Sequence, residues 1–382
     1  MNSILMVAAE ASSVIYAQRI LENLKEKNIS VQAFGVGSQQ MEKLGFERIG
    51  KSEEMAIVGA AEIISHYGLL KAVFNGLLKA AAERKPKIAI VMDYPEFNLM
   101  LSKKLHAMGI PVIYYISPQV WAWRKGRVHT IKKYCDKALL LFPFEIPFYS
   151  KHDVPHEFVG HPILDELDEK LFDPEYRTVH RSQCGITDKE IVLGLMPGSR
   201  RLELKQHFAI QLETAKRLSL LYKNLKVLIM VAPSFEKEDL HPYLEDFKIP
   251  FVMIKDEPFR MIHLCDFILA TSGTATLMVG LLKKPMVIIY RMKALTAIFA
   301  KIVVRGTKFF GLVNLILQKE VVPERFQGDV TPEKLVPLFQ KYIDDTAFAD
   351  SVRNQLGELR NHLGEKGATE RVSQIIQRYL KN

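Results

Sequence analysis

The sequence predicts an α/β protein made of two units, each a parallel β-sheet covered by helices. Three observations support this prediction. Short apolar runs alternate with longer segments of helical periodicity in both halves of the chain. The runs are apolar at almost every position, which is typical of strands that helices cover on both faces. Residues 160–188 interrupt the apolar periodicity and therefore mark a linker between the halves.

Length and composition agree with two globular domains. The chain has 382 residues, of which 48% are hydrophobic, so it can bury two substantial cores. We expect a first domain at 1–165 and a second at 166–354, with a C-terminal helix at about 355–382 that docks back on the first. The net charge of +9 favours anionic partners, whether nucleic acid, anionic lipid or phosphorylated metabolites. Three widely spaced cysteines do not make a disulfide framework.

The first half contains an alternation of strands and helices. The predicted strands are 4–9, 31–34, 88–92 and 112–116, with a turn at 10–13, a helix at 14–27 and an apolar helix at 60–82. In such sheets, ligands bind beyond the carboxyl ends of the strands. Glu10, Asp93 and Ser117 each begin a loop after a strand, so these three loops are candidate sites.

The loop that begins at Asp93 offers a general base. Asp93, Glu96 and Asn98 follow a buried strand, where two carboxylates and an amide are costly to desolvate without a ligand or partner. We favour Asp93 over Glu96 as the base, because Asp93 is the first residue beyond the strand and the backbone still fixes its side chain.

The other two loops are open to more than one interpretation. Glu10 is either a functional carboxylate or an ordinary cap at the start of a helix. Trp121 and Trp123 are interleaved with cations in the third loop. Such a run could stack a sugar, cover an acyl chain or bind nucleic acid, although buried packing alone accounts for most tryptophans.

The second half repeats the alternation. Its predicted strands are 191–195, 227–231, 251–254, 267–270 and 286–290, with helices at 202–221 and 275–282. The turn Pro197-Gly198-Ser199-Arg200 follows the first strand, with Ser199 as the expected N-cap and Arg200 placed to meet an anion. A second small-residue turn, Ser272-Gly273-Thr274-Ala275, follows the fourth strand. Each turn alone could be purely structural, but together they predict a site for a nucleoside diphosphate.

Several functional classes are disfavoured by the sequence. Gly35-Val36-Gly37 begins a dinucleotide fingerprint but lacks its third glycine. No metal-ligand spacing occurs, so we expect neither a metal nor another cofactor. His161 is most simply a hydrogen-bonded linker histidine. The amino terminus does not resemble a signal peptide and no apolar run is long enough to span a bilayer, which predicts a cytoplasmic protein.

Two stretches favour contact with a membrane surface. The helix at 60–82 has a wide apolar arc that includes Ile63, Tyr67, Leu70 and Phe74, which suits either packing on two sides or contact with lipid. Residues 291–308 contain no acid and interleave basic with apolar side chains, as expected at an anionic membrane surface. Nucleic-acid binding is not expected, because the basic residues are scattered and no recognition motif is present.

A set of motifs resembles the lipid-A-disaccharide synthase family. The motifs are Ala9-Glu10-Ala11-Ser12, Asp93-Tyr94-Pro95-Glu96-Phe97-Asn98, Ser117-Pro118-Gln119-Val120-Trp121-Ala122-Trp123-Arg124, Gly160-His161-Pro162, Pro197-Gly198-Ser199-Arg200, Ser272-Gly273-Thr274-Ala275, Asn314 and Pro323-Glu324 with Gln327. The resemblance implies a GT-B glycosyltransferase with two facing Rossmann-like domains and a cleft between them. It also implies peripheral binding to the inner face of the bacterial inner membrane.

The resemblance further implies a reaction and its residues. UDP-2,3-diacylglucosamine and 2,3-diacylglucosamine 1-phosphate would be joined to a β-1,6 disaccharide with release of UDP, without a metal or cofactor. Asp93 would be the base, Glu10 would act on the acceptor side and Arg200 would stabilise the leaving group. The donor side would include Gly198, Ser199, Arg200, Ser272, Gly273, Thr274, Ala275 and Asn314. Further substrate contacts would be Ser12, Glu96, Asn98, Trp121, Glu324 and Gln327.

The chain departs from the family pattern at two places. In the first loop, Ala9 and Ser13 stand where the family has glycines, and Val14 stands where it has aspartate. In the helix after Ser272-Gly273-Thr274, Met278 stands where the family has a glutamate suited to a ribose. Methionine is only a weak hydrogen-bond acceptor. Another UDP-sugar enzyme, such as an epimerase, and a non-catalytic paralogue that binds lipid or nucleotide are the alternative hypotheses. The oligomeric state, including a homodimer, is left open.

Overall fold

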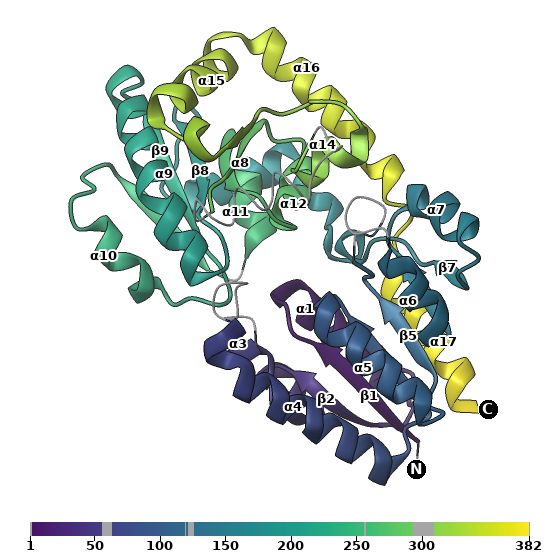
Figure 1. Ribbon diagram of the computed structural model, residues 1–382. Coiled ribbons are helices and arrows are strands. Elements are labelled where there is room, and N and C mark those ends of the chain that lie inside the picture. The colour runs from purple at the N-terminus through teal and green to yellow at the C-terminus, as the bar shows by residue number, and fades with distance from the viewer. Residues whose placement is uncertain are drawn as a thin grey trace. The chain divides into compact units, whose positions relative to one another are not determined.

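The computed structural model describes residues 2–55, 63–118, 120, 126–255, 257–292 and 309–381, and it divides the chain into two compact units. The first unit consists of Met1–Glu166 together with Leu363–Asn382, and the second of Leu167–His362 (Figure 1). Each unit contains one sheet in which all paired strands are parallel. The predicted α/β class is therefore confirmed.

The sheet of the first unit has the strand order β3-β2-β1-β4-β5-β6-β7. Its strands are β1 (Ser3–Ala8), β2 (Gln32–Gly37), β3 (Glu47–Lys51), β4 (Ile88–Met92), β5 (Val112–Tyr115), β6 (Lys137–Leu140) and β7 (His156–Phe158). The four predicted strands are present, with β2 longer than expected. We did not predict β3, β6 and β7, because these strands are short and each includes charged or polar residues that weaken the apolar pattern.

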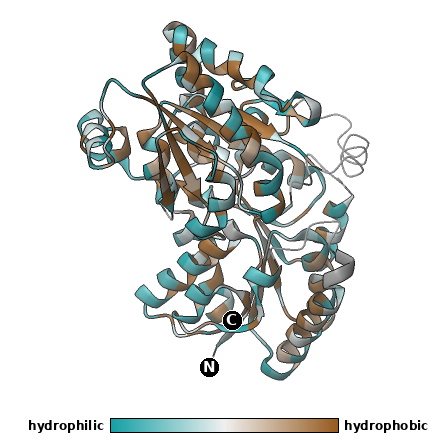
Figure 2. Ribbon diagram, turned by 90° about the vertical axis from the view of Figure 1, so that its left-hand side faces the viewer, coloured by the Kyte–Doolittle hydropathy of each residue, from teal (hydrophilic) through white to brown (hydrophobic). Residues whose placement is uncertain are grey.

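Helices cover both faces of this sheet. They are α1 (Ala11–Glu26), α2 (Gln39–Glu42), α3 (Ser52–Met55), α4 (Ile63–Arg84), α5 (Pro95–Ala107), α6 (Arg127–Tyr134), α7 (Ile146–Lys151) and α17 (Ala368–Lys381). Leu5 and Val7 of β1 belong to a core cluster shared with α4, α5 and α6. Because side chains alternate along a strand, Ile4 and Met6, which are also buried, point to the opposite face. The strands accordingly carry much of the hydrophobic colour in Figure 2.

Gly35 has a structural role rather than a role in a nucleotide fingerprint. It lies inside β2 with a φ of +140°, at a shift in the pairing between β2 and β3. A Cβ atom at this position would lie 2.0 Å from the carbonyl oxygen of Met6 on β1. Any residue other than glycine would therefore separate the two strands.

The last helix of the chain is fastened to the first unit. Asp165 caps the start of α17, where its carboxylate accepts hydrogen bonds from the backbone N–H groups of Gly367 (2.6 Å) and Thr369 (2.9 Å). Arg371 of the same helix donates to the carbonyl oxygen of Val159 (2.8 Å). Helix α17 also packs along α1, so the two chain ends contribute to one core.

The sheet of the second unit has the order β10-β9-β8-β11-β12-β13. Its strands are β8 (Ile191–Met196), β9 (Leu225–Val231), β10 (Phe251–Lys255), β11 (Phe267–Thr271), β12 (Met286–Tyr290) and β13 (Glu324–Phe326). Its helices are α8 (Pro174–Gln183), α9 (Arg201–Leu221), α10 (His241–Leu244), α11 (Pro258–Leu264), α12 (Ala275–Leu281), α14 (Leu312–Leu317), α15 (Pro332–Asp344) and α16 (Thr346–Gly357). The five predicted strands are present, and β13 was missed because it has three residues, two of them charged.

Helix α8 corrects our prediction of a linker at 160–188. We interpreted Asp173 and Pro174 as a break in the pattern, but they begin a helix. The carboxylate of Asp173 accepts a hydrogen bond from the N–H of Glu175 (2.9 Å), and Pro174 occupies the first helical turn, where its missing N–H costs nothing.

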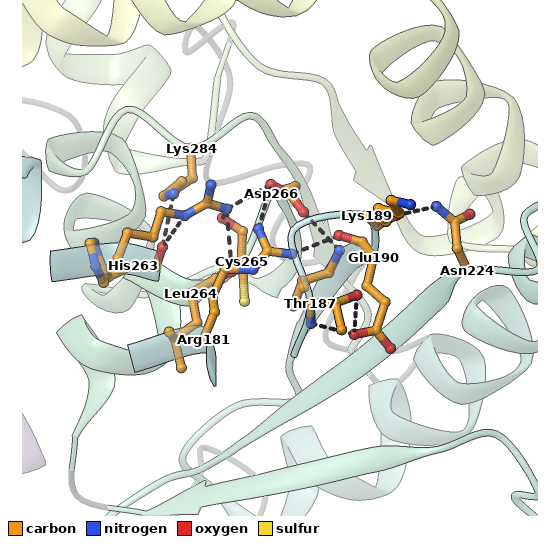
Figure 3. A network of polar contacts seen from close by, with 12 residues as sticks. Arg181, Thr187, Lys189, Glu190, Asn224, His263, Leu264, Cys265, Asp266 and Lys284 are labelled. Atoms are coloured by element: carbon orange, nitrogen blue, oxygen red, sulfur yellow. Dashed lines mark hydrogen bonds and ion pairs between the residues drawn. The ribbon is translucent and has the colours of Figure 1, made fainter. Parts of the chain in front are cut away.

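A charged network fastens α8 to the edge of the sheet at which β11 begins (Figure 3). Asp266 accepts hydrogen bonds from Arg177 of α8 (2.6 Å) and from the N–H of Val192 (2.8 Å). Arg177 and Lys284 both donate to the carbonyl oxygen of His263 at 3.0 Å. Burial, reinforced by the nearby charge of Arg177, lowers the pKa of Lys284 to about 7. The network lies at the amino ends of the strands, so we interpret it as structural.

Candidate active site

The candidate residues follow the strands at which each sheet reverses its order. In the first sheet, later strands are added on one side of β1 up to β3 and then on the other side from β4 onwards. Glu10 follows β1 and Asp93 follows β4. In the second sheet the reversal lies between β8 and β11, which Arg200 and Ser272 follow. Ligands of open parallel sheets bind beyond the strand ends at such reversal points.

Asp93 lies at the end of β4 in an unusual backbone conformation. Its φ is +49° and that of the next residue, Tyr94, is +46°. Its N–H donates to the carbonyl oxygen of Ile116 at 3.2 Å, which joins the ends of β4 and β5. Left-handed conformations in residues other than glycine store strain and are concentrated at functional sites. Asp93 therefore lies at a strained strand end, and its role as base stays a prediction.

Asn98 supports this strand end from α5. Its side chain is fully buried, and its Nδ2 atom donates to the carbonyl oxygens of Met92 (2.9 Å) and Asp93 (2.6 Å). Both amide hydrogens are therefore used within the protein. We expected Asn98 to contact substrate, whereas its geometry is that of a residue which holds Asp93.

Glu96 occupies a different environment from Asp93. Its side chain is 66% exposed and forms an ion pair with Arg127, the first residue of α6. The charge of Glu96 is thus engaged at the surface, one helical turn beyond the strand end. The sequence did not identify Arg127 as a site residue, because it stood among several other cations.

Glu10 is the N-cap residue of α1, and the turn that we predicted at 10–13 is the first turn of this helix. The buried Ser13 accounts for the early start. Its Oγ atom accepts a hydrogen bond from the N–H of Glu10 (3.1 Å) and donates to the Glu10 carbonyl oxygen (2.8 Å). Ser12 is half-buried in the same turn. The serine that departs from the family pattern therefore fixes the backbone of Glu10.

The turn after β8 differs from our prediction in one detail. The N-cap of α9 is Arg200, not Ser199. The reason is Glu203, whose carboxylate reaches back to accept the N–H of Ser199 (3.0 Å) and lies 3.6 Å from the guanidinium of Arg200. Gly198 has a φ of +113°, which a residue with a Cβ rarely adopts. The Arg200 side chain is 47% exposed, so it can reach an anion in solvent.

A buried glutamine connects the two strand ends at the second reversal point. The Nε2 atom of Gln211, on α9, donates to the carbonyl oxygen of Met196 (3.1 Å) and to the hydroxyl of Thr271 (3.4 Å). Next to Thr271, the N–H of Ser272 donates to Ile289 of β12 (2.9 Å). Sequence reasoning missed Gln211, because one polar residue on a helix is normally expected to face solvent.

The remaining residues of the second turn are positioned by local bonds. The carbonyl oxygen of Gly273 accepts from the hydroxyl of Thr276 (2.7 Å). Gly273 itself is exposed, while Thr274 and Ala275 are half-buried at the start of α12. Met278, the residue that departs from the family pattern, is half-buried one turn later.

Asn314 uses all its hydrogen-bonding capacity within the protein. Its Oδ1 atom accepts from the N–H groups of Val321 (2.8 Å) and Val322 (3.1 Å). Its Nδ2 atom donates to the Val322 carbonyl oxygen (2.8 Å) and to Oε1 of Glu324 (2.7 Å). The side chain is fully buried. We expected Asn314 to contact the donor directly, but these bonds make it a support for Glu324.

Glu324, Gln327 and His207 hold the two chain segments that flank residues 293–308. Glu324 accepts from the N–H groups of Phe310 (2.8 Å) and Gly311 (3.1 Å). The amide of Gln327 pairs with the N–H (3.2 Å) and the carbonyl oxygen (3.1 Å) of Met292.

His207 was not predicted and acts in the same region. Its Nε2 atom accepts from the N–H of Arg291 (2.7 Å), while its Nδ1 atom pairs with the carbonyl oxygen of Glu203 (2.8 Å). Burial lowers the pKa of His207 to about 4, although the Glu203 hydrogen bond opposes the shift. The neutral ring is required here, since a charged imidazole could not accept a bond at Nε2.

The sequence pattern of the family described as Lipid-A-disaccharide synthetase matches residues 4–378. The chain belongs to this family. Curated relatives named lipid-A-disaccharide synthase include one from Geobacter metallireducens, 34% identical over 377 residues (99% of this chain and 97% of the relative). Another, from Myxococcus xanthus, is 33% identical over 377 residues with the same coverage.

Solved structures confirm the fold of this member of the Lipid-A-disaccharide synthetase family. UDP-GlcNAc 2-epimerase from Neisseria meningitidis, bound to UDP-GlcNAc, superposes with a TM-score of 0.63 at 13% identity and covers 100% of both chains. The glycotransferase of kitacinnamycin gives a TM-score of 0.61 at 13% identity, covering 99% of this chain and 98% of its own. The predicted GT-B type of fold is therefore confirmed.

Parts of the predicted site lie outside the described residues. These are Trp121, Trp123 and most of the basic stretch at 291–308. Within the described part of the chain, no group of three or more His, Cys, Asp or Glu side chains is arranged to hold a metal ion. None of the helices in that part combines the length and apolar character that crossing a bilayer requires.

Proposed function

We propose that this protein is an inverting glycosyltransferase that joins UDP-2,3-diacylglucosamine to 2,3-diacylglucosamine 1-phosphate and releases UDP. The product is the β-1,6 disaccharide of lipid A. Membership of the family over residues 4–378 supports the reaction. The observation that supports particular residues is the strand order, because motif residues follow the strands on both sides of each reversal point.

In this proposal the second unit binds the UDP part of the donor. The turns at Gly198 and Ser272 have small side chains that let a diphosphate approach closely, and the first turn of α9 supplies backbone N–H groups. As the sugar–UDP bond breaks, negative charge grows on the diphosphate. Arg200 and the positive end of the α9 dipole stabilise that charge, so the donor side acts by electrostatic preorganisation.

The first unit supplies the general base. The primary hydroxyl of the acceptor attacks the anomeric carbon of the donor sugar, and Asp93 takes the hydroxyl proton as the new C–O bond forms and the bond to UDP breaks. Glu96 is less suited to this role because it pairs with Arg127 at the surface. Glu10, at the start of α1, orients the acceptor.

The reaction can be tested directly with the purified protein. Incubation with both acylated sugars should give UDP and a product with the mass of the disaccharide. Asp93→Asn should lower kcat by about 10²- to 10⁴-fold, the usual contribution of a general base, and should leave UDP affinity nearly unchanged. Asp153→Asn is a matched control, because Asp153 also has a positive φ (+50°), but its side chain is 84% exposed and forms an ion pair with Lys132 at the surface.

Other outcomes would point elsewhere. UDP binding without disaccharide formation would favour the non-catalytic hypothesis. Epimerisation of UDP-GlcNAc in a separate incubation, with no disaccharide formed from the acylated sugars, would favour an epimerase. Near-normal turnover in Asp93→Asn would move the base to Glu10 or Glu96.

We also propose that the protein binds peripherally to the inner face of the inner membrane. Tyr67 on α4 is 61% exposed, and Met100 on α5 is 59% exposed. Both side chains are large and mainly apolar, and a lipid surface would remove them from water. For Leu70 and Phe74 the sequence left packing and lipid contact open. Both pack partly against the core, and the Phe74 ring meets Phe97 edge-on at 5.5 Å. The side chain of Ile63 lies outside the described residues.

Vesicle sedimentation tests the membrane proposal. Tyr67→Ser should reduce binding to vesicles that contain anionic lipid without lowering the melting temperature. Leu220→Ser in the second unit is the control, since Leu220 is 65% exposed on α9. Equal loss of binding in both variants, or no loss in either, would contradict the assignment of α4 to the membrane surface.

A further inference from the structure

Three left-handed residues lie together at the ends of two neighbouring strands. Asp93 and Tyr94 follow β4 with φ values of +49° and +46°, and Ile116 follows β5 with a φ of +57°. The hydrogen bond from the Asp93 N–H to the Ile116 carbonyl oxygen joins them. Isoleucine is β-branched and rarely adopts this conformation. Strain at three linked positions persists only if the surroundings hold it in place.

The Tyr114 hydroxyl provides such a hold. Tyr114 lies on β5 and is fully buried, and its hydroxyl donates to the carbonyl oxygen of Asp93 at 2.9 Å. The Asn98 amide donates to the same oxygen at 2.6 Å. The peptide group that follows Asp93 is therefore held by hydrogen bonds from two elements, β5 and α5. Burial raises the pKa of the Tyr114 hydroxyl well above its ordinary value, and the nearby Asp93 charge adds to the shift. The hydroxyl thus remains a donor.

We propose that Tyr114 is a positioning residue that holds Asp93 in its strained conformation and so directs the Asp93 carboxylate toward the acceptor. This inference rests on the proposed function of Asp93 as base. The hydroxyl touches the backbone of Asp93 and acts only through it. A carboxylate carried on a relaxed backbone would leave the productive position, and a displacement of about 1 Å can reduce turnover by two orders of magnitude.

Tyr114→Phe removes the hydroxyl and keeps the ring. We expect kcat for disaccharide formation to fall by about 10- to 100-fold, with the KM values for both sugars and the melting temperature nearly unchanged. In an Asp93→Asn background the same substitution should cause no further loss, because Tyr114 acts through the carboxylate that is already missing. A crystal structure of Tyr114→Phe should show the φ of Asp93 relaxed to a negative value.

Tyr342→Phe in the second unit is the matched control. Tyr342 is also a buried tyrosine, and its hydroxyl donates to a strand carbonyl oxygen, that of Met286, at 3.1 Å. The Tyr342→Phe substitution should leave kcat for disaccharide formation unchanged. Wild-type kcat in Tyr114→Phe, or an equal loss in both backgrounds, would overturn the inference. If the unmodified protein forms no disaccharide, the proposed function fails, and the crystal structure of Tyr114→Phe tests the positioning role by itself. A positive φ at Asp93 in that variant would refute the role of the Tyr114 hydroxyl in holding the Asp93 backbone, and a negative φ would establish it.

Discussion

The bonds of Asn314 allow a direct test of whether this residue supports the fold or contacts the donor. Asn314→Ala removes four hydrogen bonds from a fully buried position. The N–H and the carbonyl oxygen of Val322 would lose their partner. The Val321 N–H would keep only its bond to the Lys319 carbonyl oxygen (3.0 Å), and Glu324 would lose one of its three hydrogen bonds. Both valines are themselves buried, so water cannot replace these bonds easily.

The size of the effect follows from the number of groups left unsatisfied. Each buried polar group without a partner costs about 1–3 kcal/mol, and rearrangement recovers part of that sum. We therefore expect Asn314→Ala to lower the free energy of unfolding of the second unit by about 3–5 kcal/mol. UDP affinity should fall as a consequence, because Glu324 would no longer be held against Phe310 and Gly311.

Asn314→Asp gives a second, pH-dependent result. The new carboxylate keeps the acceptor bonds to Val321 and Val322 but faces Oε1 of Glu324, where the asparagine nitrogen is at 2.7 Å. Burial already raises the pKa of Glu324, and a second carboxylate would raise the pKa of the pair further. A raised pKa in the folded state adds stability at low pH and removes it as pH rises. This variant should therefore be more stable near pH 5 than near pH 8.

Urea denaturation and calorimetric UDP titration together decide the question. If Asn314 supports the fold, Asn314→Ala should lower the stability of the protein and its affinity for UDP in parallel. If that variant unfolds at the same urea concentration as the unmodified protein but binds UDP much more weakly, Asn314 contacts the nucleotide and our interpretation is wrong. Asn224→Ala serves as a control, since its exposed amide makes one bond, to the carbonyl oxygen of Lys189.

Two further predictions concern charge. Arg200→Ala should weaken UDP binding by about 10- to 150-fold, equivalent to 1.5–3 kcal/mol for a charge-assisted contact, whereas Arg201→Ala should not, because Arg201 pairs with Asp239 at an exposed position; equal calorimetric affinities would refute the assignment of Arg200. Burial lowers the pKa of His161 to about 3 and of His207 to about 4. Both rings are neutral above pH 6.5, and the free energy of unfolding should fall as pH drops from 6.5 toward these pKa values. For His207 the loss should reach about 3 kcal/mol. An unchanged free energy of unfolding between pH 7 and 4.5 in urea titrations would contradict this prediction.

The sequence predicted the longer apolar strands of both sheets well and the short strands that contain charged or polar residues poorly. Runs such as Ile88–Met92 are apolar throughout and have no other plausible place than a covered sheet. The edge strands β7 and β13 have three residues each, and their pairing depends on a neighbour that no local pattern reveals. The α8 helix was hidden for a related reason, since Asp173 and Pro174 suit a helix start and a break equally well.

Candidate site residues could be identified from the sequence where a charged side chain follows an apolar strand directly. Asp93, Glu10 and Arg200 were found in this way, and their roles remain predictions. The supporting residues could not be found, because their partners are distant in sequence. Gln211 reaches Thr271, sixty positions away, and His207 reaches Arg291. Asn98 and Asn314 were identified as polar motif residues, but only coordinates reveal that their amides are used by the backbone.

The membership of α17 in the first unit also has a consequence for folding during synthesis. The second unit is continuous in sequence, so all of it has been synthesised before the ribosome reaches α17. The first unit begins to emerge earlier but lacks the helix that packs on α1 until α17 itself has been synthesised. Until then α1, whose buried side chains include Ile20 and Leu24, lacks the contact with α17. The unit that is synthesised first is therefore completed last, and apolar surface that is exposed during that interval favours aggregation.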